Sequence, residues 1–163
     1  RLGIPITTFD DHSTIDLTID GADEVDPDLN VIKGGGGALL REKIVAQVTR
    51  REIIVVDGSK LSPRLGTHWP VPVEVVDFGW RTQAAFIESL GAQPALRLNE
   101  HNAPYETDQG HYILDCDFGP ISDLAGLAAR LDARAGIVAH GLFLGIVSEV
   151  VVAGEDGIRH LTP

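Results

Sequence analysis

The chain has 163 residues, 44% of them hydrophobic and 23% charged, and its 24 acidic and 13 basic side chains give a formal net charge of −11. This is the composition of a globular protein with one domain or two small ones. The acidic balance argues against nonspecific binding to nucleic acid or anionic membranes, and no apolar stretch approaches the roughly 20 residues that a membrane-spanning helix needs.

The first half of the chain alternates strands with a helix. Residues 15–19 alternate apolar and polar side chains and run into a turn, and residues 53–56 form a continuous apolar run, which predicts a strand buried on both faces of a parallel sheet. The helix is predicted from an apolar stripe of Leu40, Ile44 and Val48. The predicted elements are a strand at 15–19, a short apolar pair at 31–32, a helix at 38–50 and a strand at 53–56.

A proline-rich step at residues 70–72 marks a boundary before a second pattern. There we predict strands at 73–76, 94–98, 112–117 and 136–144, and helices at 80–90 and 124–131. Their order, βαββαβ, is that of ferredoxin-like α+β domains. A strand at 149–153 and a turn at 154–157 are expected to rejoin the first sheet.

The predicted fold class is therefore α/β with two domains. Residues 1–72 and 146–163 are expected to form an open, mostly parallel, Rossmann-like sheet with helices on both faces. Residues 73–145 are expected to form the smaller ferredoxin-like domain.

The first candidate site follows the first predicted strand, where Asp20, Gly21, Ala22, Asp23 and Glu24 place three carboxylates within five residues. Ligands of open α/β sheets bind beyond the carboxyl ends of the strands, so the position favours a binding site. A solvated Asp-Gly turn is the alternative, and a calcium loop is a third, although the spacing is not that of an EF-hand.

The second candidate is Lys33 with the four glycines Gly34, Gly35, Gly36 and Gly37, which precede the predicted helix. Glycines let backbone N–H groups approach an anion closely, and the helix N-terminus favours negative charge. The spacing matches neither a Walker A motif nor the dinucleotide fingerprint. We favour an anion-binding site over a plain flexible loop.

Two further residues are open on spacing alone. Glu42 lies early in the predicted helix and points away from its apolar stripe, as an ordinary solvated glutamate would. Lys60 closes a short loop after the strand at 53–56, where a turn and a phosphate contact are equally consistent with the pattern. The six histidines have no metal-ligand spacing, so no metal site is predicted. The single cysteine, Cys116, cannot form an internal disulfide, which suits a cytoplasmic location, and it is expected to be an inert buried thiol.

Taken in order and spacing, the segments DGADE at 20–24, KGGGGA at 33–38, REK at 41–43 and DGSK at 57–60 resemble A-type ribose-5-phosphate isomerase. The similarity covers nearly the whole chain. It implies that Glu42 is the catalytic base, that Asp20 and Asp23 line the sugar site, and that Lys33 stabilises negative charge developing on oxygen. It also implies that Lys60 helps to hold the substrate or its phosphate.

The resemblance further implies cofactor-free interconversion of ribose 5-phosphate and ribulose 5-phosphate through an enediolate, in the non-oxidative pentose phosphate pathway. The expected partner is this small sugar phosphate, and a homodimer or homotetramer is the expected assembly. The alternative is a noncatalytic sugar-phosphate-sensing effector domain of a transcription regulator, which has no need of a full proton-transfer set.

One departure from the family pattern concerns the N-terminus. The family has an upstream strand and helix with a phosphate loop rich in Gly, Ser and Thr, whereas this sequence begins at Arg1, shortly before the DGADE segment. We therefore expect the sequence to be a truncated isomerase.

Overall fold

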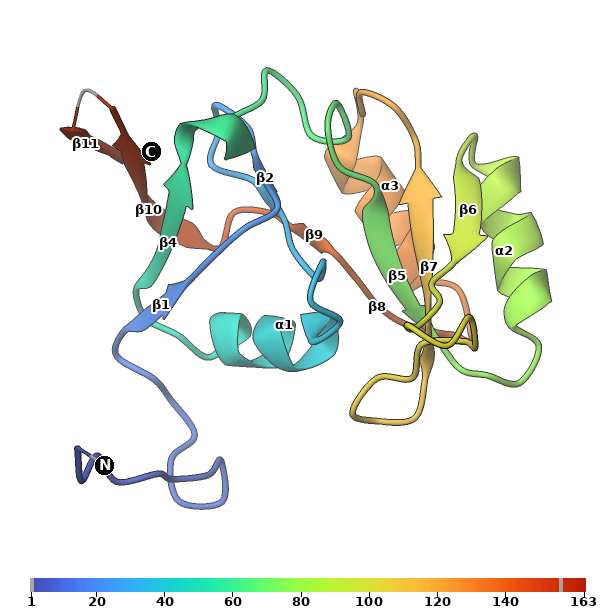
Figure 1. The fold of residues 1–163 in the computed structure, drawn as a ribbon, viewed down its shortest axis with the longest axis horizontal. Helices are drawn as coiled ribbons and strands as arrows, with labels where there is room; N and C mark the ends of the chain where they lie inside the picture. Colours follow the sequence, from blue (N-terminus) through green and yellow to red (C-terminus); the bar gives the residue numbers. More distant parts are fainter. Residues whose placement is uncertain (1, 156) are drawn as a thin grey trace.

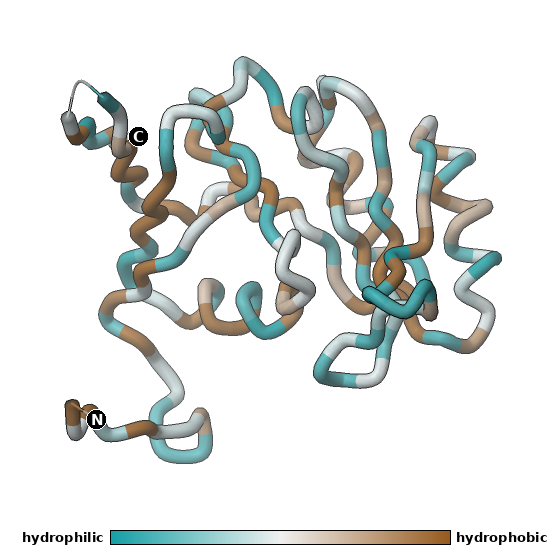
Figure 2. The backbone as a smooth tube through the Cα atoms, viewed as in Figure 1, coloured by the Kyte–Doolittle hydropathy of each residue, from teal (hydrophilic) through white to brown (hydrophobic). Residues whose placement is uncertain are grey.

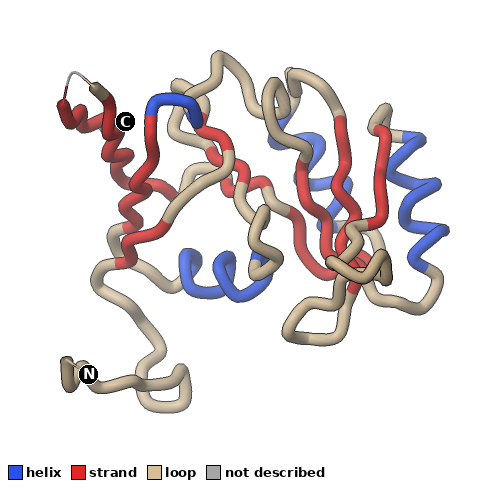
Figure 3. The backbone as a smooth tube through the Cα atoms, in the orientation of Figure 1, coloured by secondary structure: helices blue, strands red, loops and turns tan. Residues whose placement is uncertain are grey.

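The computed structural model describes residues 2–155 and 157–163 and has an α/β fold, which confirms the predicted class (Figure 1). Its strands form three sheets, and the helices are coloured blue in Figure 3. The α-helices found in the described residues are α1 (Leu39–Gln47), α2 (Trp80–Ser89) and α3 (Leu124–Asp132).

The first sheet has the strand order β1-β4-β10-β11 and is mostly parallel. Pairs β1/β4 and β4/β10 are parallel, and β11 closes the edge as an antiparallel hairpin with β10. The strands are β1 (Thr18–Asp20), β4 (Glu52–Asp57), β10 (Val147–Gly154) and β11 (Gly157–Leu161). Because β1 and β4 are parallel, Asp20 and Asp57 end their strands at the same edge of the sheet.

Strand β1 begins three residues later than predicted. The N–H of Ile15 donates to Val48 O, and Ile15 O accepts from the N–H of Arg50. Ile15 is therefore paired with the turn that follows α1 rather than with the sheet.

The prediction that residues 53–56 are buried on both faces is wrong. Along β4 the side chains alternate, with Ile54 and Val56 buried and Val55 46% exposed. The buried face joins a cluster that includes Val31, Phe143 and Val150. The other face of β4, which carries Val55, is not covered by any element in the described part of the chain. The continuous apolar run therefore does not mark a strand buried on both faces here.

Helix α1 also turns a different face inward from the one predicted. Leu39 and Ala46 are buried, whereas Ile44 is 42% exposed. Leu39 and Ala46 are seven residues apart and so share one side of the helix, which packs toward β8 and β5. Glu42, three residues after Leu39, consequently lies at the edge of the buried side rather than opposite it.

A small antiparallel sheet of order β2-β3-β9 connects the two larger sheets. Its strands are β2 (Glu24–Val25), β3 (Val31–Ile32) and β9 (Leu142–Phe143). The single strand predicted at 136–144 is thus divided at Gly141 into β8 (Ile137–His140) and β9. The N–H of Gly141 donates to Pro72 O, and the carbonyl of Gly141 accepts from Lys33 N. At this residue the chain therefore passes from the third sheet to the small sheet.

The third sheet confirms the predicted βαββαβ order, with strands arranged β6-β7-β5-β8 and every neighbouring pair antiparallel. Its other strands are β5 (Val71–Val75), β6 (Gln93–Leu96) and β7 (Tyr112–Asp117). Val71, Val73 and Val75 of β5 pack against Ile87 of α2 and Leu131 of α3.

Apolar segments, brown in Figure 2, follow the strands of both larger sheets. Buried side chains fall mainly into two clusters, one around β4 and β10 and one around β5, α2 and α3. The division into domains at residues 1–72 with 146–163 and 73–145 stays a prediction, and the two clusters are consistent with it.

Candidate active site

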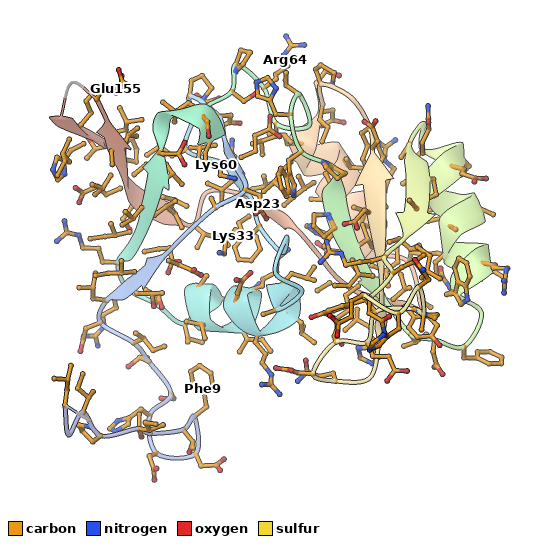
Figure 4. The ribbon with its side chains drawn as sticks, viewed as in Figure 1. Phe9, Asp23, Lys33, Lys60, Arg64 and Glu155 are labelled. Carbon is orange, nitrogen blue, oxygen red and sulfur yellow. The ribbon has the colours of Figure 1, made fainter. Side chains whose placement is uncertain are left out.

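A polar cavity of about 230 Å³ opens at the carboxyl end of β1. It brings together the carboxylate segment, the lysine–glycine segment and the start of α1, which are separate in the sequence. Figure 4 labels Asp23 and Lys33, which lie close to each other above α1 in this view. The cavity is lined by Asp20, Gly21, Ala22, Asp23, Lys33, Gly34, Gly35, Gly36 and Glu42.

Lys33 is the buried cation of this cavity, with only 4% of its side chain exposed. Its Nζ lies 2.9 Å from Asp20 Oδ2 and 3.5 Å from Glu42 Oε1, and it donates to Gly21 O over 2.6 Å. A buried charge is costly unless it is paired and hydrogen-bonded, and Lys33 has both kinds of partner. The backbone that presents it is fixed because Lys33 N donates to Gly141 O.

Glu42 is a half-buried neighbour of this ammonium group. Its Oε2 is buried without a hydrogen-bond partner among the described residues. Burial raises the pKa of Glu42 above its usual value, the positive charge of Lys33 counteracts this, and the negative charge of Asp20 adds to it. A carboxylate that lines a polar cavity and has a raised pKa is suited to accept a proton from a bound molecule.

Asp23 holds the glycine segment in place. Its Oδ2 accepts a hydrogen bond of 2.7 Å from Gly35 N, and its own N–H donates to Ile32 O. A Cβ atom on Gly35 would lie 2.6 Å from Asp23 Oδ1, so the close approach requires glycine at this position.

Two proposed site residues are not in the cavity wall. Gly37 has φ +90° and donates its N–H to Gly34 O, closing the turn that carries the other glycines. Lys60 ends a 3-10 turn (Gly58–Lys60), and its Nζ lies 4.9 Å above the ring of Trp69. In the view of Figure 4, Lys60 lies on the Arg64 side of Asp23.

Glu24, the third carboxylate of the DGADE segment, is turned away from the cavity. It is 1% exposed and accepts hydrogen bonds from the N–H groups of Gly66, Thr67 and His68. These bonds fix the loop that leads into β5, so Glu24 has a structural role.

Sequence reasoning missed two residues that bear on the site. Arg97 reaches the glycine segment from the third sheet and donates to Gly34 O and Gly35 O. Glu52, at the start of β4, is 2% exposed, and its Oε2 has no hydrogen-bond partner in the described chain. Burial and the negative charge of Asp20 raise the pKa of Glu52. Neither residue belongs to a local motif, so no sequence signal marked them.

His140, at the end of β8, is buried. Its Nδ1 lies 3.2 Å from Lys43 Nζ, and burial together with the Lys43 charge lowers its pKa to about 4. Within residues 2–155 and 157–163, no three His, Cys, Asp or Glu side chains are arranged to hold a metal ion. No helix in the same residues is long and apolar enough to cross a membrane.

The fold places a polar cavity at the carboxyl end of a parallel strand and pairs a half-buried carboxylate with a buried lysine there, an arrangement typical of enzymes that move protons on small polar substrates. Residues 1–157 match the family model of ribose 5-phosphate isomerase A (phosphoriboisomerase A). The chain belongs to this family.

Relatives and solved structures agree with the family match. Ribose-5-phosphate isomerase A of Chloroflexus aurantiacus is 60% identical over 162 residues, which cover 99% of this chain and 68% of the relative. A D-ribose-5-phosphate isomerase solved in complex with phospho-erythronic acid is 36% identical with a TM-score of 0.95, covering 98% of this chain and 70% of that one. Ribose 5-phosphate isomerase from Plasmodium falciparum is 38% identical with a TM-score of 0.94, covering 99% and 72%.

Proposed function

We propose that this protein interconverts ribose 5-phosphate and ribulose 5-phosphate through an enediolate, with Glu42 as the base. The observation that carries the proposal is the pairing of Glu42 with the buried Lys33 in one polar cavity, 3.5 Å apart. Membership of an isomerase family fixes the reaction class.

In the proposed reaction, Glu42 removes the C2 proton of the open-chain aldose and returns it at C1. The electron pair left at C2 moves to form the enediolate, and the negative charge develops on the oxygen of C1. Lys33 is placed to stabilise that charge, because a fixed ammonium group in a cavity needs no reorganisation during the reaction. To complete the isomerisation, the O2 hydroxyl proton must reach O1, and Asp20 is the proposed carrier.

Asp23 and the glycines are proposed to bind the substrate and to shape the cavity. The Asp23 hydrogen bond to Gly35 N supports this role, because it fixes the glycine segment against the carboxylate segment. Lys60 is proposed to contact the phosphate from outside the cavity wall. Its Nζ lies 4.9 Å from the centre of the Trp69 ring, and the residue is only partly buried, which supports a contact with an anion.

The noncatalytic sensor is disfavoured. Binding alone does not require a carboxylate whose pKa is raised and whose Oε2 lacks a partner, and every reported relative is named as an isomerase. The effector-domain hypothesis has no support in these comparisons.

The test is Glu42→Gln, which keeps the size of the side chain but cannot accept the proton. Turnover of ribose 5-phosphate should fall by about 10²–10⁴-fold while substrate binding is largely kept. The control is Glu88→Gln on the exposed side of α2, which should behave as the parent protein. Turnover of Glu42→Gln within about threefold of the parent would contradict the assignment of Glu42 as the base, because removal of a general base lowers turnover far more than that.

We also propose a homodimer or homotetramer in the cytoplasm. Ile19 and Val55 on the first sheet and Ile44 on α1 are exposed apolar side chains, which supports association. The free, buried thiol of Cys116 is consistent with a reducing compartment. Light scattering after size-exclusion chromatography tests the assembly, and cell fractionation tests the location; a monomer or a secreted protein would contradict them.

A further inference from the structure

Two consecutive carbonyl groups of the glycine segment face the same side chain. Arg97 Nη1 donates to Gly34 O over 2.9 Å and to Gly35 O over 3.1 Å. Arg97 follows β6 in the third sheet, so this contact joins the ferredoxin-like part of the chain to the cavity wall.

The first of these peptide groups links Arg97 to Asp23. In a trans peptide the C=O of one residue and the N–H of the next point in opposite directions. The Gly34 carbonyl faces Arg97, and the Gly35 N–H of the same peptide donates to Asp23 Oδ2 over 2.7 Å. Arg97 therefore orients the peptide that holds Asp23.

The second peptide places a donor at the cavity. Because the Gly35 carbonyl faces Arg97, planarity directs the Gly36 N–H to the opposite side. Gly36 lines the cavity, and in the described part of the chain its N–H has no hydrogen-bond acceptor. This N–H is available to an oxygen atom of a bound substrate.

Arg97 is itself held rigidly. Its Nε lies 2.9 Å from Asp115 Oδ2, and its Nη2 lies 2.5 Å from Asp115 Oδ1, a two-point contact that fixes the plane of the guanidinium group. The Arg97 side chain is 15% exposed. Tyr105 supports the same segment, since its hydroxyl lies 3.4 Å from Gly36 O and a Cβ on Gly37 would overlap it.

We propose that Arg97 is a positioning residue that aims the Gly35 N–H at Asp23 and the Gly36 N–H at the oxygen that becomes negative in the reaction. The second part rests on the proposed isomerase function. Lysine cannot replace Arg97, because a single ammonium group does not reproduce the planar fork that joins Asp115 to two carbonyls.

The test compares Arg97→Met and Arg97→Lys with the control Arg130→Met. Arg130 lies on α3 and donates to a carbonyl of its own helix, so it samples the loss of an arginine without touching the glycine segment. Both Arg97 variants should lower kcat by about 10-fold or more with a smaller change in KM, because a misaimed donor acts mainly on the transition state. Millimolar guanidinium should restore part of the activity of Arg97→Met and leave Arg130→Met unchanged.

Hydrogen–deuterium exchange of residues 33–38 provides a readout that does not depend on catalysis. Exchange there should be faster in both Arg97 variants than in the parent and in Arg130→Met, with the β4 and β10 peptides unaltered. Unaltered exchange at residues 33–38 in the Arg97 variants would overturn the proposal. So would a kcat of the Arg97 variants equal to that of Arg130→Met, given that the parent protein is active. If the parent protein does not isomerise ribose 5-phosphate, the proposed function fails, while the exchange result still decides whether Arg97 orients the segment.

Discussion

Lys33 Nζ lies 3.5 Å from Glu42 Oε1, so the proposed base and the proposed stabiliser of the enediolate are paired with each other. Burial and the Lys33 charge act in opposite directions on the proton affinity of Glu42, because burial raises its pKa and the positive charge lowers it. Removing the lysine should therefore change the pH dependence as well as the rate.

For Lys33→Ala, we expect turnover to fall more than KM changes, since charge on the enediolate exists only along the reaction path. Glu42 works as a base only when ionised, so activity is lost as the pH falls through its pKa. Without Lys33 that pKa is higher, and the loss should begin at a higher pH. The measurement is kcat/KM against pH for the parent, Lys33→Ala and the charge-retaining Lys33→Arg; an acid limb at the same pH in all three would contradict the pairing.

The glycine segment offers a matched pair of substitutions. Gly35→Ala places a Cβ 2.6 Å from Asp23 Oδ1 and must displace that carboxylate, whereas a Cβ on Gly36 meets nothing within 4 Å. Gly35→Ala should lower kcat/KM by about 10²-fold, the order that misplacement of a positioning group costs. Gly36→Ala should lower kcat/KM much less. The measurement is kcat/KM of the two purified variants, with their Tm values compared to confirm that both are folded. Equal losses would mean that the Asp23–Gly35 contact is not what makes glycine necessary.

Much of the fold follows from local patterns. Valines alternate with other residues along β5, and apolar residues recur at helical spacing along α2 and α3. The βαββαβ order can be read from these patterns directly. The division of β8 from β9 is not, because it depends on Gly141 bonding to both Pro72 and Lys33, which are distant in the chain.

The site divides in the same way. Asp20, Lys33 and the glycines stand out because their residue types are unusual next to strand ends. Glu42 does not, since its burial depends on how α1 packs against β8 and β5. Arg97 is 62 and 63 residues from its glycine acceptors, and only the tertiary fold brings them together.

Lys60 is expected to contribute to binding rather than to the chemical step. A phosphate contact is present in the ground state and the transition state alike, so Lys60→Ala should raise KM and leave kcat nearly unchanged. The comparison variant is Lys60→Arg, which keeps the positive charge over the Trp69 ring and should stay near the parent KM. A fall in kcat with no change in KM would place Lys60 in the chemical step instead.

Glu52 is expected to limit stability at neutral pH. Burial and the charge of Asp20 raise its pKa, so the folded protein favours the protonated form, and the ionised form is buried at a cost. Its favourable contribution is present below the ordinary pKa of 4.5 and is lost as the pH rises through the raised value in the folded state.

Glu52→Gln removes this charge without changing the size of the side chain. The variant should therefore have a higher Tm than the parent at pH 8, by about 2–4 °C for each kcal/mol recovered. The difference should shrink as the pH is lowered toward 4, where the parent carboxyl is protonated. Thermal unfolding followed by circular dichroism at several pH values measures this, with Glu88→Gln on the exposed side of α2 as the control. A Tm difference between Glu52→Gln and the parent that does not vary with pH would show that Glu52 is not ionised against a penalty in the folded protein.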